Sequence, residues 1–157
     1  MKTLSQINLL LLLLVPTIGM GFDYHSLADA VAIAESNKDY QAVGDSGKAR
    51  GAWQMWRIAW DQTNKVRKAA GLKQYPWSYA HDQYVGRMYA VEYLRWCGGV
   101  LERHLGRKPF YWEVYAAYAR GPETFIDDHF CSYPSLPART HRAIGIIAAQ
   151  LREPLPR

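Results

Sequence analysis

The chain has 157 residues, of which 49% are hydrophobic and 21% are charged. This length suits one compact domain with a real core, and the apolar content argues against a disordered chain. The formal net charge is +5, from 19 Lys and Arg against 14 Asp and Glu. Because no long Lys/Arg run accompanies that charge, the composition argues against a nucleic-acid-binding protein.

Residues 1–21 differ in kind from the rest of the chain. Lys2 precedes an uninterrupted apolar run from Leu9 to Val15, a proline ends the run, and small residues around Gly21 suit cleavage. This pattern predicts a secretory signal peptide over 1–21 and a mature chain over 22–157 that is secreted or periplasmic. The alternative is an uncleaved membrane anchor, but a span needs about 20 apolar residues. We therefore expect no stable membrane insertion after cleavage.

Export has consequences for charge and for the cysteines. Loss of Lys2 leaves 18 basic residues against 14 acidic ones, a net charge of about +4, which suits an anionic polymer such as a cell wall. Cys97 and Cys131 are the only cysteines, and an oxidising compartment permits them to pair. The sequence therefore predicts a disulfide, with two buried free thiols as the alternative.

Helical periodicity dominates the mature chain. The first predicted helix begins at Ser26, carries an apolar stripe and ends near Glu35. A loop rich in glycine, serine and aspartate then covers 37–51. The remaining predicted helices cover 52–70, 82–105, 111–120, 122–130 and 138–152, with loops at 75–77 and 134–137. Because no period-two alternation persists, the pattern predicts a single all-α domain.

Three short segments stand out in this helical pattern. They are Glu35-Ser36, the run from Gly51 to Gln54 that reads Gly-Ala-Trp-Gln, and the run from Ala116 to Pro122 that reads Ala-Ala-Tyr-Ala-Arg-Gly-Pro. In order and spacing they resemble the motifs of the soluble lytic transglycosylase domain of the lysozyme superfamily. The third segment departs from that family, which commonly has an asparagine where this chain has Ala119.

Two further stretches extend the resemblance. The segment from His81 to Trp96 resembles the long helix of the same family between its second and third motifs. The loop from Gly44 to Gly47, together with the Gly51 to Gln54 segment, is also similar to goose-type and invertebrate-type lysozymes. The resemblance therefore implies a single-domain lysozyme-like fold.

The resemblance also implies a reaction. The expected enzyme is an exported muramidase that cleaves the MurNAc-GlcNAc β-1,4 bond of peptidoglycan as a lytic transglycosylase and leaves 1,6-anhydromuramoyl ends. Glu35 is the expected general acid and then base, and partial burial would raise its pKa for that task. No second carboxylate is needed, because the acetamido group of the substrate assists departure of the leaving group.

Two alternatives remain open. A hydrolytic lysozyme needs a second carboxylate. Asp45 is the candidate, although an aspartate between Gly44 and Ser46 is also typical of a turn. The other alternative is a non-catalytic lysozyme-like glycan-binding protein, which the departure at Ala119 admits.

Side chains around the expected acid complete the candidate site. A glutamine amide can donate and accept hydrogen bonds at once, and a tyrosine hydroxyl could bond Glu35 or the substrate. For the tyrosine the alternative is core packing with a satisfied hydroxyl, and a tryptophan inside the motif could stack on a sugar. The expected substrate-binding residues are Ser36, Gly51, Trp53, Gln54 and Tyr118.

Metal and cofactor sites have little support in the sequence. The five histidines are scattered and form no His-x-x-x-His pair, and no glycine-rich phosphate loop follows a strand. We therefore expect no metal and no cofactor. The expected partner is the glycan strand of peptidoglycan, bound by a monomer, with a secretion or wall-remodelling complex as a further partner.

Overall fold

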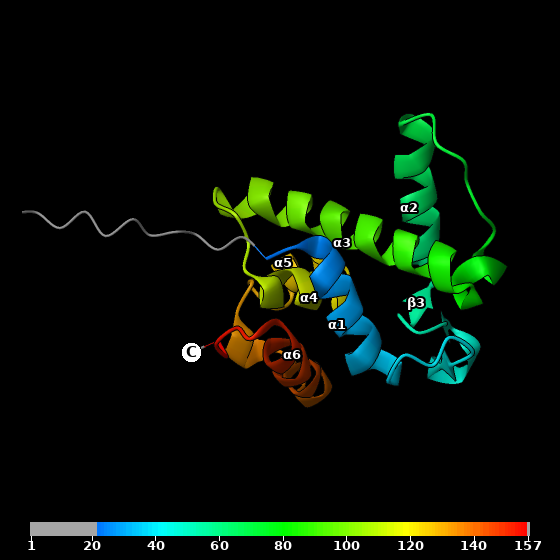
Figure 1. Ribbon diagram of the computed structural model, residues 1–157. Coiled ribbons are helices and arrows are strands. Elements are labelled where there is room, and N and C mark those ends of the chain that lie inside the picture. Colours follow the sequence, from blue (N-terminus) through cyan, green and yellow to red (C-terminus); the bar gives the residue numbers. More distant parts are fainter. Residues whose placement is uncertain (1–21, 157) are drawn as a thin grey trace, which may run out of the picture.

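The computed structural model describes residues 22–156, so the predicted signal peptide over 1–21 lies outside the described residues. Within them, six α-helices surround one core and a small antiparallel sheet lies beside the helices (Figure 1). In chain order the elements are α1 (Tyr24–Ser36), β1 (Val43–Gly44), η1 (Asp45–Gly47), β2 (Ala49–Arg50), β3 (Met55–Trp56), α2 (Arg57–Ala69), η2 (Trp77–His81), α3 (Gln83–Leu105), α4 (Tyr111–Arg120), α5 (Pro122–Asp127), η3 (Tyr133–Ser135) and α6 (Ala138–Leu151). The prediction of a mostly helical fold is confirmed, whereas the sheet was not expected.

Helix α1 carries the expected acid at its end. Asp23 caps the helix by accepting a hydrogen bond of 2.9 Å from the backbone N–H of Ser26. The side chains of Leu27 and Val31 are fully buried in the core. The helix ends where Asn37 adopts the left-handed conformation with φ of 55°. Glu35 therefore lies in the last turn, where the chain leaves the core.

The segment after α1 folds into the three-stranded sheet. Strand β2 pairs with β1 and with β3, both antiparallel. Between β2 and β3, Gly51 has φ of +72°, and a Cβ atom there would lie 1.8 Å from the carbonyl oxygen of Ala80. Gln54 also has a positive φ, 47°. The helix predicted from residue 52 is therefore wrong at its start, because these turns keep the chain out of helical geometry until Arg57.

Helix α3 is the spine of the fold. It has 23 residues, and Asp82 caps it by accepting from the backbone N–H groups of Tyr84 and Val85. It ends at Gly106, which has φ of 66°. Helices α1, α2 and α4 all pack against it. No helix among residues 22–156 is both long enough and apolar enough to cross a membrane.

Helix α2 is joined to α3 by an aromatic stack and an ion pair. The ring centroids of Trp60 and Tyr89 lie 3.8 Å apart. Next to them, the guanidinium group of Arg67 pairs with Glu92, and Arg67 is only 5% exposed. These contacts hold α2 upright on one end of α3, where Figure 1 shows it projecting from the rest of the molecule.

The last three helices close the other side of the core. The buried side chain of Glu113 accepts from the backbone N–H of Phe110 at 2.7 Å and pairs with Arg107, which holds the first turn of α4. Pro122 opens α5, as predicted, but α5 ends at Asp127 rather than Phe130. Helix α6 packs on α1 and α4 through the apolar stripe that the sequence predicts.

The predicted disulfide is wrong, because Cys97 and Cys131 are both free. Cys97 is fully buried on the core face of α3. Cys131 follows α5 and is half-buried. Burial raises the pKa of both thiols, which favours their protonated, unreactive form. At Cys131 the charge of Glu113 raises the pKa of the thiol further, and the charge of Arg107 lowers it.

Candidate active site

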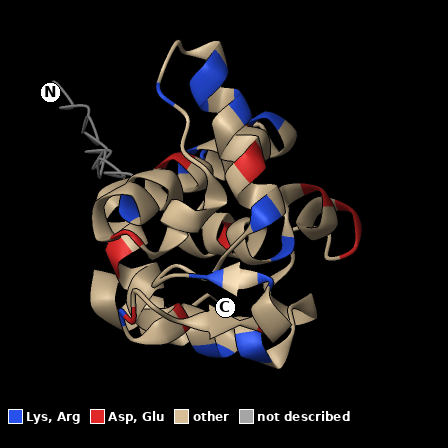
Figure 2. Ribbon diagram, turned by 90° about the vertical axis from the view of Figure 1, so that its right-hand side faces the viewer, with Lys and Arg blue, Asp and Glu red and all other residues tan. Residues whose placement is uncertain are grey.

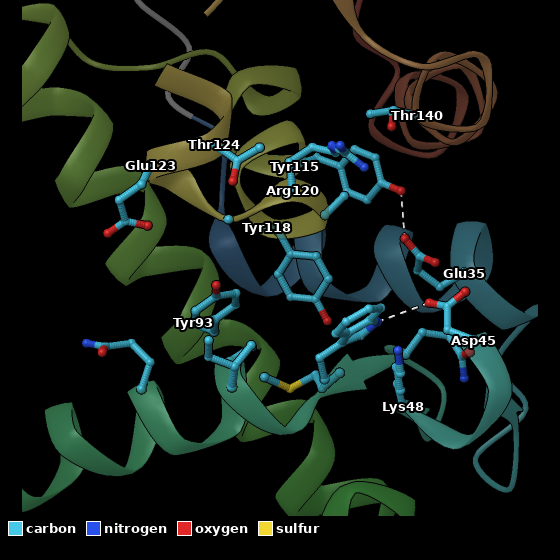
Figure 3. Close-up of a pocket in the computed structure, with 18 of the residues that line it drawn as sticks. Glu35, Asp45, Lys48, Tyr93, Tyr115, Tyr118, Arg120, Glu123, Thr124 and Thr140 are labelled. Atoms are coloured by element: carbon cyan, nitrogen blue, oxygen red, sulfur yellow. Dashed lines mark hydrogen bonds between the residues drawn. The ribbon is translucent and has the colours of Figure 1, made fainter. Parts of the chain in front are cut away.

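A cleft with a volume of about 1180 Å³ brings together most of the elements of the fold. Its walls come from the end of α1, the sheet region, α2, α3, α4, α5 and the start of α6. Figure 3 shows side chains of these elements around one central space. Pockets for small molecules have volumes of about 300 to 1,000 Å³, so this cleft has room for an extended ligand.

The carboxyl group of Glu35 lies in this cleft and is largely withdrawn from water. Its side chain is 10% exposed, and the Tyr115 hydroxyl donates a hydrogen bond of 2.6 Å to Oε1 (Figure 3). Burial raises the pKa of Glu35, and this effect outweighs the opposing influence of the Tyr115 hydrogen bond and of the Arg139 charge. A carboxyl group in this state holds its proton nearer to neutral pH, as a general acid must.

One guanidinium group links Glu35 to Asp45. Arg139, in the first turn of α6, places Nη2 3.6 Å from Oε2 of Glu35 and Nη1 3.2 Å from Oδ1 of Asp45. The other oxygen of Asp45, Oδ2, accepts a hydrogen bond of 3.0 Å from Nε1 of Trp56. Asp45 therefore lies in the cleft with both of its oxygens engaged by protein donors.

Gln54 and Tyr118 both line the cleft. The side-chain amide of Gln54 donates to the carbonyl oxygen of Gly51 at 2.9 Å. The hydroxyl of Tyr118 donates to the carbonyl oxygen of Trp53 at 2.6 Å. Tyr118 thus does not bond Glu35. The hydroxyl that does so belongs to Tyr115, one helical turn earlier on α4. For Tyr118 the structure matches the alternative, a largely buried ring with a satisfied hydroxyl.

Ser36 and Gly51 stand behind the cleft rather than in its lining. The hydroxyl of Ser36 donates to the carbonyl oxygen of Ala52 at 2.9 Å, which ties the end of α1 to the loop between β2 and β3. Gly51 allows that loop to pass against Ala80. Neither residue lines the cleft. Both were expected to contact the substrate, but in the structure they support the residues that line the cleft.

The expectation for Trp53 needs correction. Its side chain is 3% exposed, and Nε1 donates to the carbonyl oxygen of Ala28 at 2.8 Å in the core. A ring so enclosed presents no face to a sugar. The tryptophan that lines the cleft is Trp56, which is 43% exposed, and Trp96 lines it from α3.

Two residues that contact Glu35 were missed in the sequence. Tyr115 lies three positions before Tyr118 on α4, and residues three apart share a helix face. That spacing could have drawn attention to it. Arg139 carries no such signal, because its approach to Glu35 depends on how α6 docks on α1. Trp56 was passed over because it follows the motif rather than lying inside it.

The charges around the cleft are balanced. Its lining includes Lys48, Lys65, Arg120 and Arg139, and it includes Glu35, Asp45, Asp61 and Glu123. The ribbon in Figure 2 likewise shows basic and acidic residues interspersed on the side of the molecule that it presents. The cleft itself therefore lacks the excess of positive charge that the whole chain carries.

These features together define what the cleft can do chemically. It offers one buried carboxyl group for proton transfer, a carboxylate held by an arginine, and aromatic rings for apolar faces of a ligand. Among residues 22–156, no group of three or more His, Cys, Asp and Glu side chains could hold a metal ion. Comparisons of the chain with protein-family models, with curated proteins and with solved structures found no match.

Proposed function

We propose that this protein is an exported muramidase with a lysozyme-like fold, and that it cleaves the MurNAc-GlcNAc β-1,4 bond of peptidoglycan as a lytic transglycosylase. The proposal rests above all on Glu35, a carboxyl group with raised pKa in a cleft large enough for an extended polymer. The three sequence segments support it further. Glu35 and Gln54 line the cleft, and the Ala116 to Pro122 segment contributes Tyr118 to the same lining.

In the first step, protonated Glu35 gives its proton to the glycosidic oxygen as the bond from that oxygen to C1 breaks. The acetamido group of the sugar that carries C1 assists by stabilising the positive charge that develops at C1. Tyr115 supports this step, because its hydrogen bond to Oε1 stabilises the negative charge that Glu35 acquires.

In the second step, the C6 hydroxyl oxygen of the sugar attacks C1 and its proton passes to Glu35. A C1–O6 bond forms, Glu35 regains its proton, and the product carries a 1,6-anhydro ring. No water is consumed, so one carboxyl group is sufficient for both steps.

The engagement of Asp45 favours this route over hydrolysis through a second carboxylate. A nucleophile or base must offer an oxygen lone pair to C1 or to a water molecule, and the charge of Arg139 and the hydrogen bond from Trp56 make the oxygens of Asp45 poorer at this. A second candidate function, glycan binding without turnover, is favoured by Ala119. This residue lines the cleft where the resembling family commonly presents an asparagine.

The test is mass spectrometry of the soluble fragments that the mature chain releases from purified peptidoglycan. Fragments lighter than hydrated muropeptides by one water, about 18 Da, would support the transglycosylase. Hydrated ends would instead indicate a lysozyme. Glu35→Gln is the matched variant and should release nothing. Retention on insoluble peptidoglycan without release by either protein would favour the binding function.

A further inference from the structure

Arg139 stands between two carboxyl groups and touches the acid itself. Its side chain is 69% exposed, so only its guanidinium tip is engaged, by Glu35 at 3.6 Å and by Asp45 at 3.2 Å. Because the side chain is long and mostly free of packing contacts, it can leave one partner at little cost.

The hydrogen bonds at Glu35 make this position consequential. Oε1 accepts from the Tyr115 hydroxyl, so the acid proton of Glu35 belongs on Oε2, and Oε2 is the oxygen that faces Arg139. A guanidinium group has only donors and no acceptor. Protonation of Oε2 removes the negative charge that attracts Arg139 and puts a new donor on the atom that Arg139 faces, so the proton and the ion pair oppose each other.

Lys48 and Arg120 line the same cleft, but among the described groups that shift the pKa of Glu35, Arg139 is the one cation. Tyr115 and Tyr118 approach from α4 and Asp45 from η1. Helix α3 also packs on α1, but the ion pair between these two helices, Arg87 with Asp29, lies near the other end of α1. The ionic state of Glu35 therefore depends on one mobile cation and one fixed anion.

We propose that Arg139 is a positioning residue that holds Glu35 as a carboxylate in the free protein and moves to Asp45 alone when Glu35 takes up its proton. Asp45 is then the residue that retains Arg139 in the cleft, rather than a nucleophile. This last step rests on the proposed function: Arg139 must leave Oε2 before the glycosidic oxygen of the substrate can approach Oε2.

The test follows the titration of Glu35 in the free protein by carbon-13 NMR of its side-chain carboxyl group. Arg139→Met should move the midpoint upward by roughly half a pH unit to one pH unit, since a mostly exposed cation is removed. Asp45→Asn should move it downward, because a neighbouring negative charge is lost and Arg139 is left to Glu35 alone. Arg139→Lys keeps the charge and should largely restore the midpoint.

Arg142→Met is the matched control. It removes one exposed positive charge from the same helix outside the cleft lining and should leave the midpoint in place. An unchanged midpoint in Arg139→Met, or equal upward shifts in Arg139→Met and Arg142→Met, would overturn the proposal. So would an upward shift in Asp45→Asn.

Turnover is measured in parallel as a function of pH. If fragments are released, the alkaline limb of the pH profile should shift with the NMR midpoint in each variant. If no protein releases fragments while the midpoints move as expected, the proposed function fails and the role of Arg139 stands. If fragments are released but Arg139→Met leaves the midpoint unchanged, the role of Arg139 fails alone.

Discussion

Replacing Tyr115 with phenylalanine removes the hydroxyl that donates to Oε1 of Glu35 at 2.6 Å and keeps the buried aromatic ring. A hydrogen bond contributes about 1 kcal/mol with a neutral acceptor and about 1.5 to 3 kcal/mol with a charged one. As Glu35 gives up its proton, its carboxyl group changes from a neutral acceptor to a charged one. The transition state therefore gains about 0.5 to 2 kcal/mol from Tyr115, and Tyr115→Phe should lower kcat about 2- to 30-fold where Glu35 is protonated.

The same substitution should also change the pH dependence. The hydroxyl stabilises the charged form of Glu35, so its removal raises the pKa of Glu35 further above the ordinary value. The alkaline limb should therefore move to higher pH, and the ratio of variant to wild-type rate should increase as pH rises. Fragment release from peptidoglycan, measured across pH, gives both quantities.

Tyr118→Phe is the matched control for this experiment. Its hydroxyl donates to the carbonyl oxygen of Trp53 rather than to Glu35. We expect the control to lose about 1 kcal/mol of unfolding free energy with its alkaline limb unchanged. The reasoning would be refuted if Tyr115→Phe kept the wild-type rate and limb, or if both variants shifted the limb equally.

Three further predictions concern stability and the thiols. Glu35→Gln should be more stable than wild type at pH 7, with the difference vanishing below pH 4.5. The raised pKa of Glu35 means that its contribution to stability is full below its ordinary pKa and is lost as pH rises through the folded value; urea unfolding across pH checks this. Gly51→Ala should destabilise the fold by about 3 kcal/mol or more in the same assay, because its Cβ would meet Ala80 at 1.8 Å; a wild-type unfolding midpoint would contradict the packing described. Alkylation of unfolded, unreduced protein should label both Cys97 and Cys131, whereas protection of both would indicate a disulfide.

Most helices could be predicted because their signals are local. Asp82 and Gly106 bound α3 where a capping aspartate and a terminal glycine predict its ends. The sheet could not be predicted in this way, since each strand has only two residues and shows no period. The turn at Gln54, with φ of 47°, helps to keep residues 52–56 out of the helix that the sequence predicts from residue 52.

The candidate site could be predicted only in part for a similar reason. Glu35 was identified from its place at the end of the first predicted helix together with the resemblance of its segment to a family motif, and the structure places it in the cleft. Which tyrosine bonds it depends on the rotation of α4, and which tryptophan is exposed depends on the path of the chain after Gly51. Trp53 and Trp56 are three residues apart, yet one lies in the core and the other in the cleft.

The two arginine pairs described above should respond differently to ionic strength. Arg67 and Glu92 are shielded from water, and dissolved ions screen such a pair weakly. Arg139 is mostly exposed, and added salt weakens its hold on Glu35 and Asp45. The contact between α2 and α3 should therefore depend little on ionic strength, whereas the protonation of Glu35 should depend on it. We therefore expect the fold to tolerate both dilute and concentrated salt, and the pKa of Glu35 to differ between the two.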